Sequence, residues 1–214
     1  MIESAAEILR EYGPFPEVEH VHGVTFDGEH VWFASGSRLN ALDPASGEVV
    51  RTINVPARAG TAFDGQHLFQ LAADRIQKID PRTGDVLATI PAPGGASGLA
   101  WAEGMLWLGQ YQGRKILQID PETGAVLRTI ESTRFVTGVT WVDGALWHGA
   151  WDDGGSDLRR IDPATGEVLE RLAMPMGMSV SGLESDGGDR FFCGGGKSGM
   201  VRAVRRPSGL ARTA

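Results

Sequence analysis

Two short phrases alternate along the chain, and their repetition constrains the fold more than any other feature. The first starts at a glycine and runs to an aromatic residue, as in "GVTFDGEHVWFA". The second reads "IDPxTG" or a close variant, followed by an apolar pair, as in "IDPETGAVLRTI". The first phrase starts about 40 residues apart at five glycines: Gly23, Gly60, Gly98, Gly138 and Gly182. A period near 40 residues, with room for four short strands per copy, is typical of β-propeller blades.

Each copy predicts four antiparallel strands, which we call a to d in chain order. An Asp-Gly type turn joins strands a and b, and the "DPxTG" turn joins strands c and d. Proline fixes one backbone angle of that turn, and glycine supplies the positive φ that it needs. We therefore predict an all-β, five-bladed propeller that forms a single domain over residues 1–214, with blades starting near the five glycines.

The fifth copy lacks a clear strand d, so the ring needs another segment to complete it. The N-terminal "AEILREYGPF" (residues 6–15) has the apolar pattern of the strand-d segment "GAVLRTIEST" (residues 124–133). We predict that residues 1–15 form the outer strand of the last blade, which would protect the open edges of the ring. The alternative is a short N-terminal helix that ends at Gly13.

Charge and cysteine content narrow the class of protein. The net charge is −7, with too few cations for the basic stripe that nucleic-acid binding requires. The single cysteine, Cys193, suits a reducing compartment, and no apolar run approaches membrane-spanning length. We expect a cytoplasmic protein without nucleic-acid or membrane partners, acting on a small-molecule substrate as a monomer or weak homo-oligomer.

The repeat separates packing residues from candidate site residues. Five tryptophans occupy matching positions in strands a and b and are predicted to pack between blades: Trp32, Trp101, Trp107, Trp141 and Trp147. Trp151 has no matching position. The d–a and b–c loops, which share one face of the disc, carry nearly all the sequence variation. A rigid scaffold with variable loops on one face is expected to hold its site there, near the axis.

Three of the five histidines also have no match in the other copies: His20, His22 and His148. His22 immediately precedes a strand-a glycine, where the other blades have Ala59, Ser97, Thr137 and Ser181. His148 follows a strand-b tryptophan, where the others have Phe33, Gln70, Leu108 and Cys193.

The blade pattern resembles two known propeller families. "EHVHGVTFDGEHVWFASGSRL" (residues 19–39) is similar to a blade of the streptogramin B lyases, and "IDPxTGxVxxxI" resembles the five-bladed glutamine cyclotransferases. The lyase resemblance implies that His22 occupies the place of the catalytic base. The lyases' metal-binding glutamates have no acidic counterpart, because the matching residues are Ser35, Ala72, Gln110, Ala150 and Gly195. Both resemblances imply an enzyme of lyase or cyclotransferase type.

The first hypothesis for the chemistry is a site for one divalent transition metal. Its ligands would be His20, His22 and His148, with Asp152, Asp153 or Cys193 in support, because imidazoles joined by a carboxylate or thiolate suit such ions. His20 and His22 are two residues apart, which places both on one side of an extended segment.

The second hypothesis is metal-free acid–base catalysis with His22 or His148 as the base, since histidine titrates near neutral pH. Asp152 or Asp153 would orient the base or hold a cationic group, and Tyr111 and Trp151 would flank an apolar substrate. Arg58 and Arg134 would bind a carboxylate. The third hypothesis is a non-catalytic propeller that binds a ligand or a protein through the same face, with Trp151, Tyr111 and Phe135 as the contact surface.

Overall fold

The computed structural model describes residues 1–207 as a five-bladed, all-β propeller, which confirms the predicted fold class. Residues 208–214 of the predicted domain lie outside the described residues. Blade one contains β3 (Val24–Phe26), β4 (Val31–Ala34), β5 (Gly36–Leu42) and β6 (Val49–Ala57); blade two contains β7 (Thr61–Phe63), β8 (Leu68–Ala72), β9 (Arg75–Ile79) and β10 (Val86–Pro91); blade three contains β11 (Ala96–Ala102), β12 (Met105–Gln110), β13 (Lys115–Ile119) and β14 (Val126–Glu131). Blade four contains β15 (Phe135–Val142), β16 (Ala145–Asp152), β17 (Gly155–Ile161) and β18 (Val168–Ala173), and blade five contains β19 (Gly182–Ser185), β20 (Arg190–Gly194) and β21 (Val201–Arg205).

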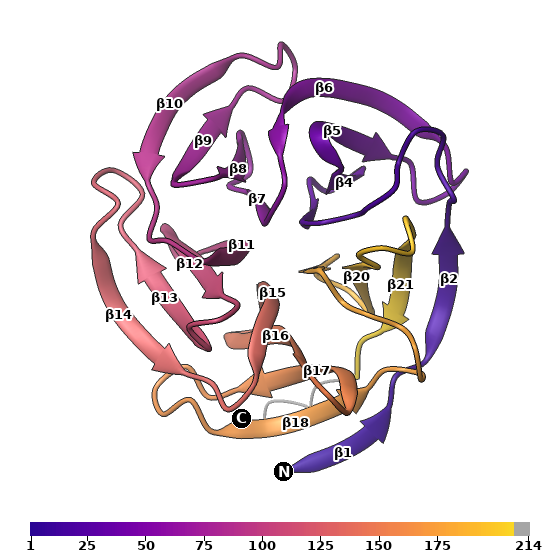
Figure 1. Cartoon of the computed structure of the whole chain (residues 1–214), viewed down its shortest axis with the longest axis vertical. Coiled ribbons are helices and arrows are strands. Elements are labelled where there is room, and N and C mark those ends of the chain that lie inside the picture. Colours follow the sequence, from indigo (N-terminus) through magenta and orange to yellow (C-terminus); the bar gives the residue numbers. More distant parts are fainter. Residues whose placement is uncertain (208–214) are drawn as a thin grey trace.

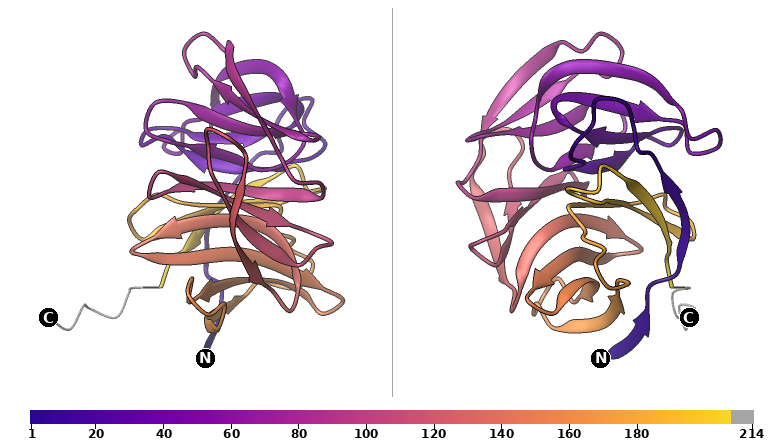
Figure 2. Two further views of the ribbon diagram at one scale, coloured as in Figure 1. Left: turned by 90° about the vertical axis from the view of Figure 1, so that its left-hand side faces the viewer. Right: turned by 45° about the vertical axis from the view of Figure 1, so that its right-hand side comes forward.

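The blades surround a central axis, with strand a of each blade innermost (Figure 1). Strands β3, β7, β11, β15 and β19 contact one another around this axis. Side views show the blades fanned around the axis (Figure 2). The described residues include no helix that is long and apolar enough to cross a membrane.

The N-terminal segment closes the ring as a strand and not as a helix. β2 (Ile8–Tyr12) pairs antiparallel with β21, with Tyr12 opposite Val201, and supplies the fourth strand of blade five. Tyr12 is buried among residues of blades five and one. The predicted closure is therefore confirmed, and it joins the two ends of the repeat through backbone hydrogen bonds.

The first residues differ from the prediction that residues 1–15 all belong to the last blade. β1 (Ile2–Ala5) pairs in parallel with β18 and adds a fifth strand to blade four. The chain crosses between blades at Ala6, whose N–H donates to Ala173, and Glu7, whose carbonyl accepts from Arg205. β1 thus pairs with backbone N–H and C=O groups at the outer edge of blade four that would otherwise lack partners.

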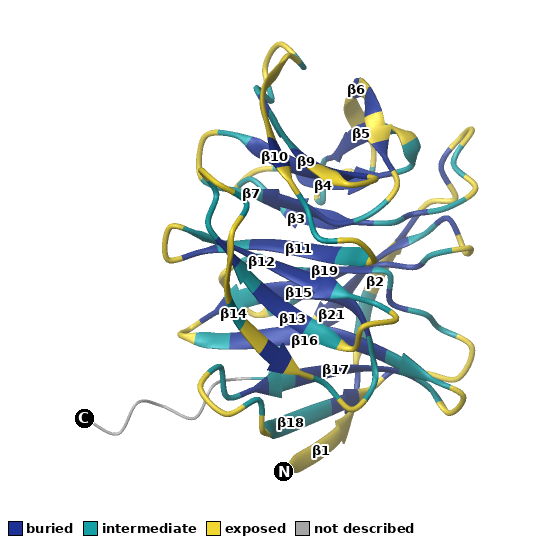
Figure 3. Cartoon of the chain, turned by 60° about the vertical axis from the view of Figure 1, so that its left-hand side comes forward, coloured by how far each residue is buried: buried dark blue, intermediate teal, exposed yellow. Residues whose placement is uncertain are grey.

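The predicted tryptophan positions do join neighbouring blades. Phe69 of blade two stacks on Trp101 of blade three, and Trp107 of blade three stacks on Trp141 of blade four, each pair with ring centroids 5.3 Å apart. Buried residues concentrate in the inner strands, while the turns and β1 are exposed (Figure 3). Packing between blades is therefore the main source of the core.

The five leading glycines form a ring around the axis, which we call the glycine ring. A Cβ on Gly60 would lie 2.3 Å from the backbone nitrogen of Leu99, and one on Gly98 would lie 2.9 Å from Cα of Gly138. Gly182 meets Gly23 in the same way, so the contacts continue around the ring. Only glycine allows this approach of backbone to backbone, which explains why every copy of the first phrase begins with it.

Candidate functional site

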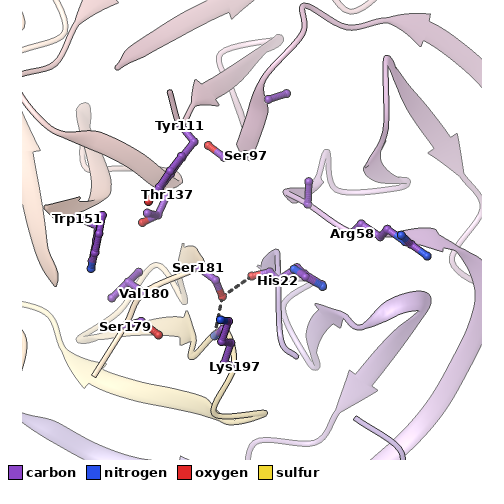
Figure 4. A pocket seen from close by; sticks show the side chains of 13 residues that line it. His22, Arg58, Ser97, Tyr111, Thr137, Trp151, Ser179, Val180, Ser181 and Lys197 are labelled. Carbon is purple, nitrogen blue, oxygen red and sulfur yellow. Dashed lines mark hydrogen bonds between the residues drawn. The ribbon is translucent and has the colours of Figure 1, made fainter. Parts of the chain in front are cut away.

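A cavity of about 620 Å³ opens on the face formed by the d–a and b–c loops, and we call it the axial pocket. Figure 4 shows the side chains that line it. They come from every blade: His22, Arg58, Ala59, Ala96, Ser97, Tyr111, Thr137, Trp151, Ser179, Val180, Ser181, Gly196 and Lys197.

The floor of the pocket comes from the repeat itself. Each residue that precedes a ring glycine lines the cavity, and we call these five the floor residues: His22, Ala59, Ser97, Thr137 and Ser181. Equivalent positions in the five blades therefore contribute one side chain each to a shared space above the glycine ring. The variation among these five residues sets the chemistry of the floor.

The hydroxyl groups of two floor residues donate hydrogen bonds to the backbone, and that of a third has no partner. Ser97 lies 2.7 Å from the carbonyl oxygen of Val136 in the next blade, and Ser181 lies 2.9 Å from that of His22. Both bonds connect adjacent blades beneath the pocket. Thr137 is buried, and its hydroxyl has no hydrogen-bond partner among the described residues.

His22 lies on the same side of the pocket as Arg58 (Figure 4). Its ring stacks on that of His20, with centroids 5.8 Å apart and planes 7° apart, as expected for two residues on one side of an extended segment. Burial lowers the pKa of His22, and the nearby His20 and Arg58 lower it further. His22 is therefore neutral at pH 7 and can accept a proton.

Aromatic side chains form the opposite side of the pocket. Tyr111 stacks on Phe135 with ring centroids 4.7 Å apart, and Trp151 lies 6.5 Å from Tyr111. Arg114 lies over the ring of Phe135, with its guanidinium carbon 4.5 Å from the ring centroid. Tyr111 and Trp151 line the cavity, so this side offers flat apolar surface.

The structure does not place His148 in the pocket. His148 is buried in β16, where its Nδ1 lies 3.0 Å from the carbonyl oxygen of Gly149. Burial lowers its pKa to about 4, so it is a neutral core residue. The matching residues Phe33, Gln70, Leu108 and Cys193 are buried as well, so the register itself marked this position as core.

Two further predicted residues, Arg134 and Asp152, belong to an ion-pair network and do not line the cavity. Arg134 binds Asp152 at 2.6 Å and the buried Asp157 at 2.8 Å. Asp157 also binds Arg159 and Arg171, so its carboxylate is compensated. Asp153 is exposed in the turn that follows β16. None of the three predicted residues lines the axial pocket, and Arg134 is not free to bind a substrate carboxylate.

The predicted metal ligands do not converge. The rings of His20 and His22 stack, but His148 is buried in β16. Residues 1–207 contain no group of three His, Cys, Asp or Glu side chains placed to hold a metal ion. Cys193 is fully buried in the core of blades four and five, and burial raises its pKa to about 12. The thiol is protonated at neutral pH and has the properties of a packing residue.

Sequence reasoning missed the polar residues that accompany His22. Thr137, Ser97 and Ser181 occupy the same register as His22, so alignment of the copies alone would have placed them on one floor. Lys197 lies in the glycine-rich b–c loop of blade five and lines the pocket beside Ser181. Glu184 was missed too; it lies two residues after its ring glycine, where the other blades have Thr25, Ala62, Ala100 and Thr140.

Comparison with known proteins gives structural relatives only. No protein-family model and no curated protein sequence matches the chain. The crystal structure of Myxococcus xanthus glutaminyl cyclase matches with a TM-score of 0.79 and 21% identity, covering 95% of this chain and 97% of that one. Kuenenia stuttgartiensis hydrazine synthase matches with a TM-score of 0.54 and 17% identity, and a chain of a mitotic checkpoint complex with 0.53 and 15%.

The two weaker matches cover 92% and 86% of this chain but only 59% and 63% of their own. The glutaminyl cyclase matches over nearly the full length of both chains. A sequence identity of 21% shows that the two proteins share a fold, and it does not show that they share a reaction. The chain is thus a five-bladed propeller that shares its fold with the Myxococcus glutaminyl cyclase.

Proposed function

We propose that the chain is a small-molecule enzyme of cyclotransferase or lyase type, with His22 as its general base. One observation carries the proposal: His22 is the only titratable floor residue, and its surroundings keep it neutral in a pocket on the propeller axis. The full-length likeness to the Myxococcus glutaminyl cyclase supports the cyclotransferase class.

His22 can serve both reaction types in the same manner. In a cyclisation, its imidazole takes a proton from the attacking amine of the substrate and returns it to the leaving group as the new ring closes. In an elimination, it takes a proton from carbon and returns it to the departing group. Either way the base is regenerated within one turnover. The cations Arg58 and Lys197 line the same pocket and would stabilise negative charge that develops on the substrate.

The test compares the wild type with His22→Ala, using ammonia release from glutaminyl peptides and substrate depletion in a panel of amino-acid amides. Loss of a positioned base should lower kcat/KM by about 100-fold or more. His30→Ala is the control, since His30 lies by the a–b turn on the other face and its ring is partly exposed. Wild-type turnover in His22→Ala contradicts the proposal.

The pH profile gives a second, independent check. The pKa of His22 lies below the ordinary value of 6.5, so the acidic limb of kcat/KM should fall below pH 6.5. Replacing His20 by Ala removes a neighbouring positive charge, which should move that limb toward higher pH. An unshifted limb would show that another group is the base.

A non-catalytic, ligand-binding propeller is the second candidate, and the charge of the pocket favours it. Among the described residues that line the cavity, none is a carboxylate that could orient His22 or pair with its imidazolium form. Saturable binding without conversion of any panel compound would support this alternative.

A further inference from the structure

The two sides of the axial pocket differ in chemistry. Arg58 and His22 lie on one side, while Tyr111, Thr137 and Trp151 lie on the other (Figure 4). Both sides line one cavity of about 620 Å³, which is large enough for a ring-containing molecule. A ligand that fills the cavity must therefore match a cationic side and a flat apolar side together.

The cationic side has charges that the protein does not neutralise. Arg58 and Lys197 line the pocket, and neither forms an ion pair with an acidic side chain within residues 1–207. The nearby Arg134 shows the opposite case, with Asp152 and Asp157 both bound to it. An uncompensated guanidinium at a pocket favours a carboxylate, which it binds through two parallel hydrogen bonds.

The Thr137 hydroxyl is not available to a ligand, although it lacks a partner. Ser97 and Ser181 bond to carbonyl groups of neighbouring blades, but the equivalent Thr137 does not. Its oxygen is inaccessible to solvent and lies against β16, since a Cβ added to Gly149 would be 2.5 Å from it. Tyr111 and Trp151 therefore supply the contacts of this side as flat apolar surface.

We propose that the axial pocket binds a small carboxylate that carries a flat apolar ring. The carboxylate binds Arg58, Lys197 adds a second positive charge to the cavity, and the ring stacks against Tyr111 and Trp151. This names the ligand class of the proposed function and rests on the same pocket, but binding is measurable without turnover.

The charge and ring requirements are tested with phenylacetate, phenylacetamide and acetate by calorimetry on the full chain. Phenylacetate should bind most tightly, since the amide lacks the charge and acetate lacks the ring. Arg58→Gln should weaken phenylacetate binding by about tenfold and leave phenylacetamide unchanged. Arg82→Gln is the matched control, because Arg82 is 85% exposed in a c–d turn of the opposite face. Equal affinity for the acid and the amide, or no saturable binding of phenylacetate at about 10 mM, overturns the proposal.

The two proposals fail separately. If Arg58→Gln weakens phenylacetate binding as described but His22→Ala retains full turnover, the ligand class stands and the catalytic role of His22 falls. If His22→Ala abolishes turnover while phenylacetate binds the wild type and Arg58→Gln equally, the ligand class is wrong.

Discussion

Glu184 is the one acidic side chain among the innermost strands at its register, and three neighbouring blades meet at its carboxyl group. Thr25 of blade one donates to it at 2.9 Å, Thr140 of blade four donates to its other oxygen, and its own blade supplies the N–H of Ser185. Although the side chain keeps some solvent exposure, burial raises the pKa of the carboxyl to about 7 despite these donors. Its protonation state therefore changes near neutral pH.

Glu184 should make stability depend on pH. Between its ordinary pKa of 4.5 and about 7, the folded protein keeps a proton that the unfolded chain has lost. The stabilisation is complete below pH 4.5 and disappears as the pH rises through 7, a loss of about 3 kcal/mol at most. Urea unfolding at pH 5 and pH 8 should show this loss in the wild type and not in Glu184→Gln. The same pH dependence in both proteins would exclude Glu184 as its source.

Single residues also show which parts of the site could be predicted from the sequence. The register placed His22 on a floor shared by all blades and His148 in a slot whose other occupants are buried, so the outcome for both could be worked out from the repeat. The missing partner of Thr137 could not. Ser97, Ser181 and Thr137 are chemically alike, and only the side-chain geometry distinguishes the hydroxyl that bonds to the next blade from the one that does not.

At the scale of elements, the two N-terminal strands have unequal roles. β2 completes blade five, buries Tyr12 and joins blade one, because the Arg10 guanidinium donates to the carbonyl oxygens of Pro44 and Ala45. β1 is exposed along its whole length and is tied to blade four by its backbone pairing and by the ion pair of Glu3 with Arg171. Closure of the ring therefore depends on β2.

Two truncations separate these roles. Deletion of residues 1–5 should lower the melting temperature by less than about 3 °C, since exposed pairs add little. Deletion of residues 1–12 should lower it by about 10 °C or more, because blade five loses its outer strand and a buried tyrosine. Calorimetry on both truncated proteins provides the comparison. Equal effects would show that β2 does not close the ring.

Sequence reasoning predicted β2 and not the place of β1, for a physical reason. β2 has the apolar pattern of a strand d because one of its faces packs against the blade. β1 buries neither face, so no alternation marks it, and its parallel pairing with β18 uses backbone groups alone.

At the scale of the whole molecule, the glycine ring fixes how closely the blades approach the axis. Gly98→Ala would place a methyl group within 3.0 Å of the backbone of Gly138 and Val139, so the blades must separate. We expect a loss of about 3 kcal/mol or more in the free energy of unfolding. Gly94→Ala is the control, because nothing lies within 4 Å of its added Cβ. Urea denaturation of the two variants measures the difference, and similar curves would show that the ring tolerates side chains.

The repeat accounts for the number of blades, the faces of the disc and the packing of the tryptophans. It could not supply the contents of the pocket. The aromatic side depends on Tyr111 and Trp151 from two different b–c segments, and the pairing of Arg134 with Asp152 and Asp157 depends on loop geometry. Loops that follow no periodic pattern are placed by contacts that a single sequence does not display.

The close approach of the five glycines also affects how a ligand enters and leaves the axial pocket. Below the ring, Thr25, Ala62, Ala100 and Thr140 are essentially inaccessible to solvent, and Glu184 lies among them. The axis is therefore narrow at this level, where Glu184 alone of the five residues keeps some solvent exposure. A molecule too large to pass these side chains leaves the axial pocket by the face through which it entered, so a spent molecule blocks the next arrival until it departs.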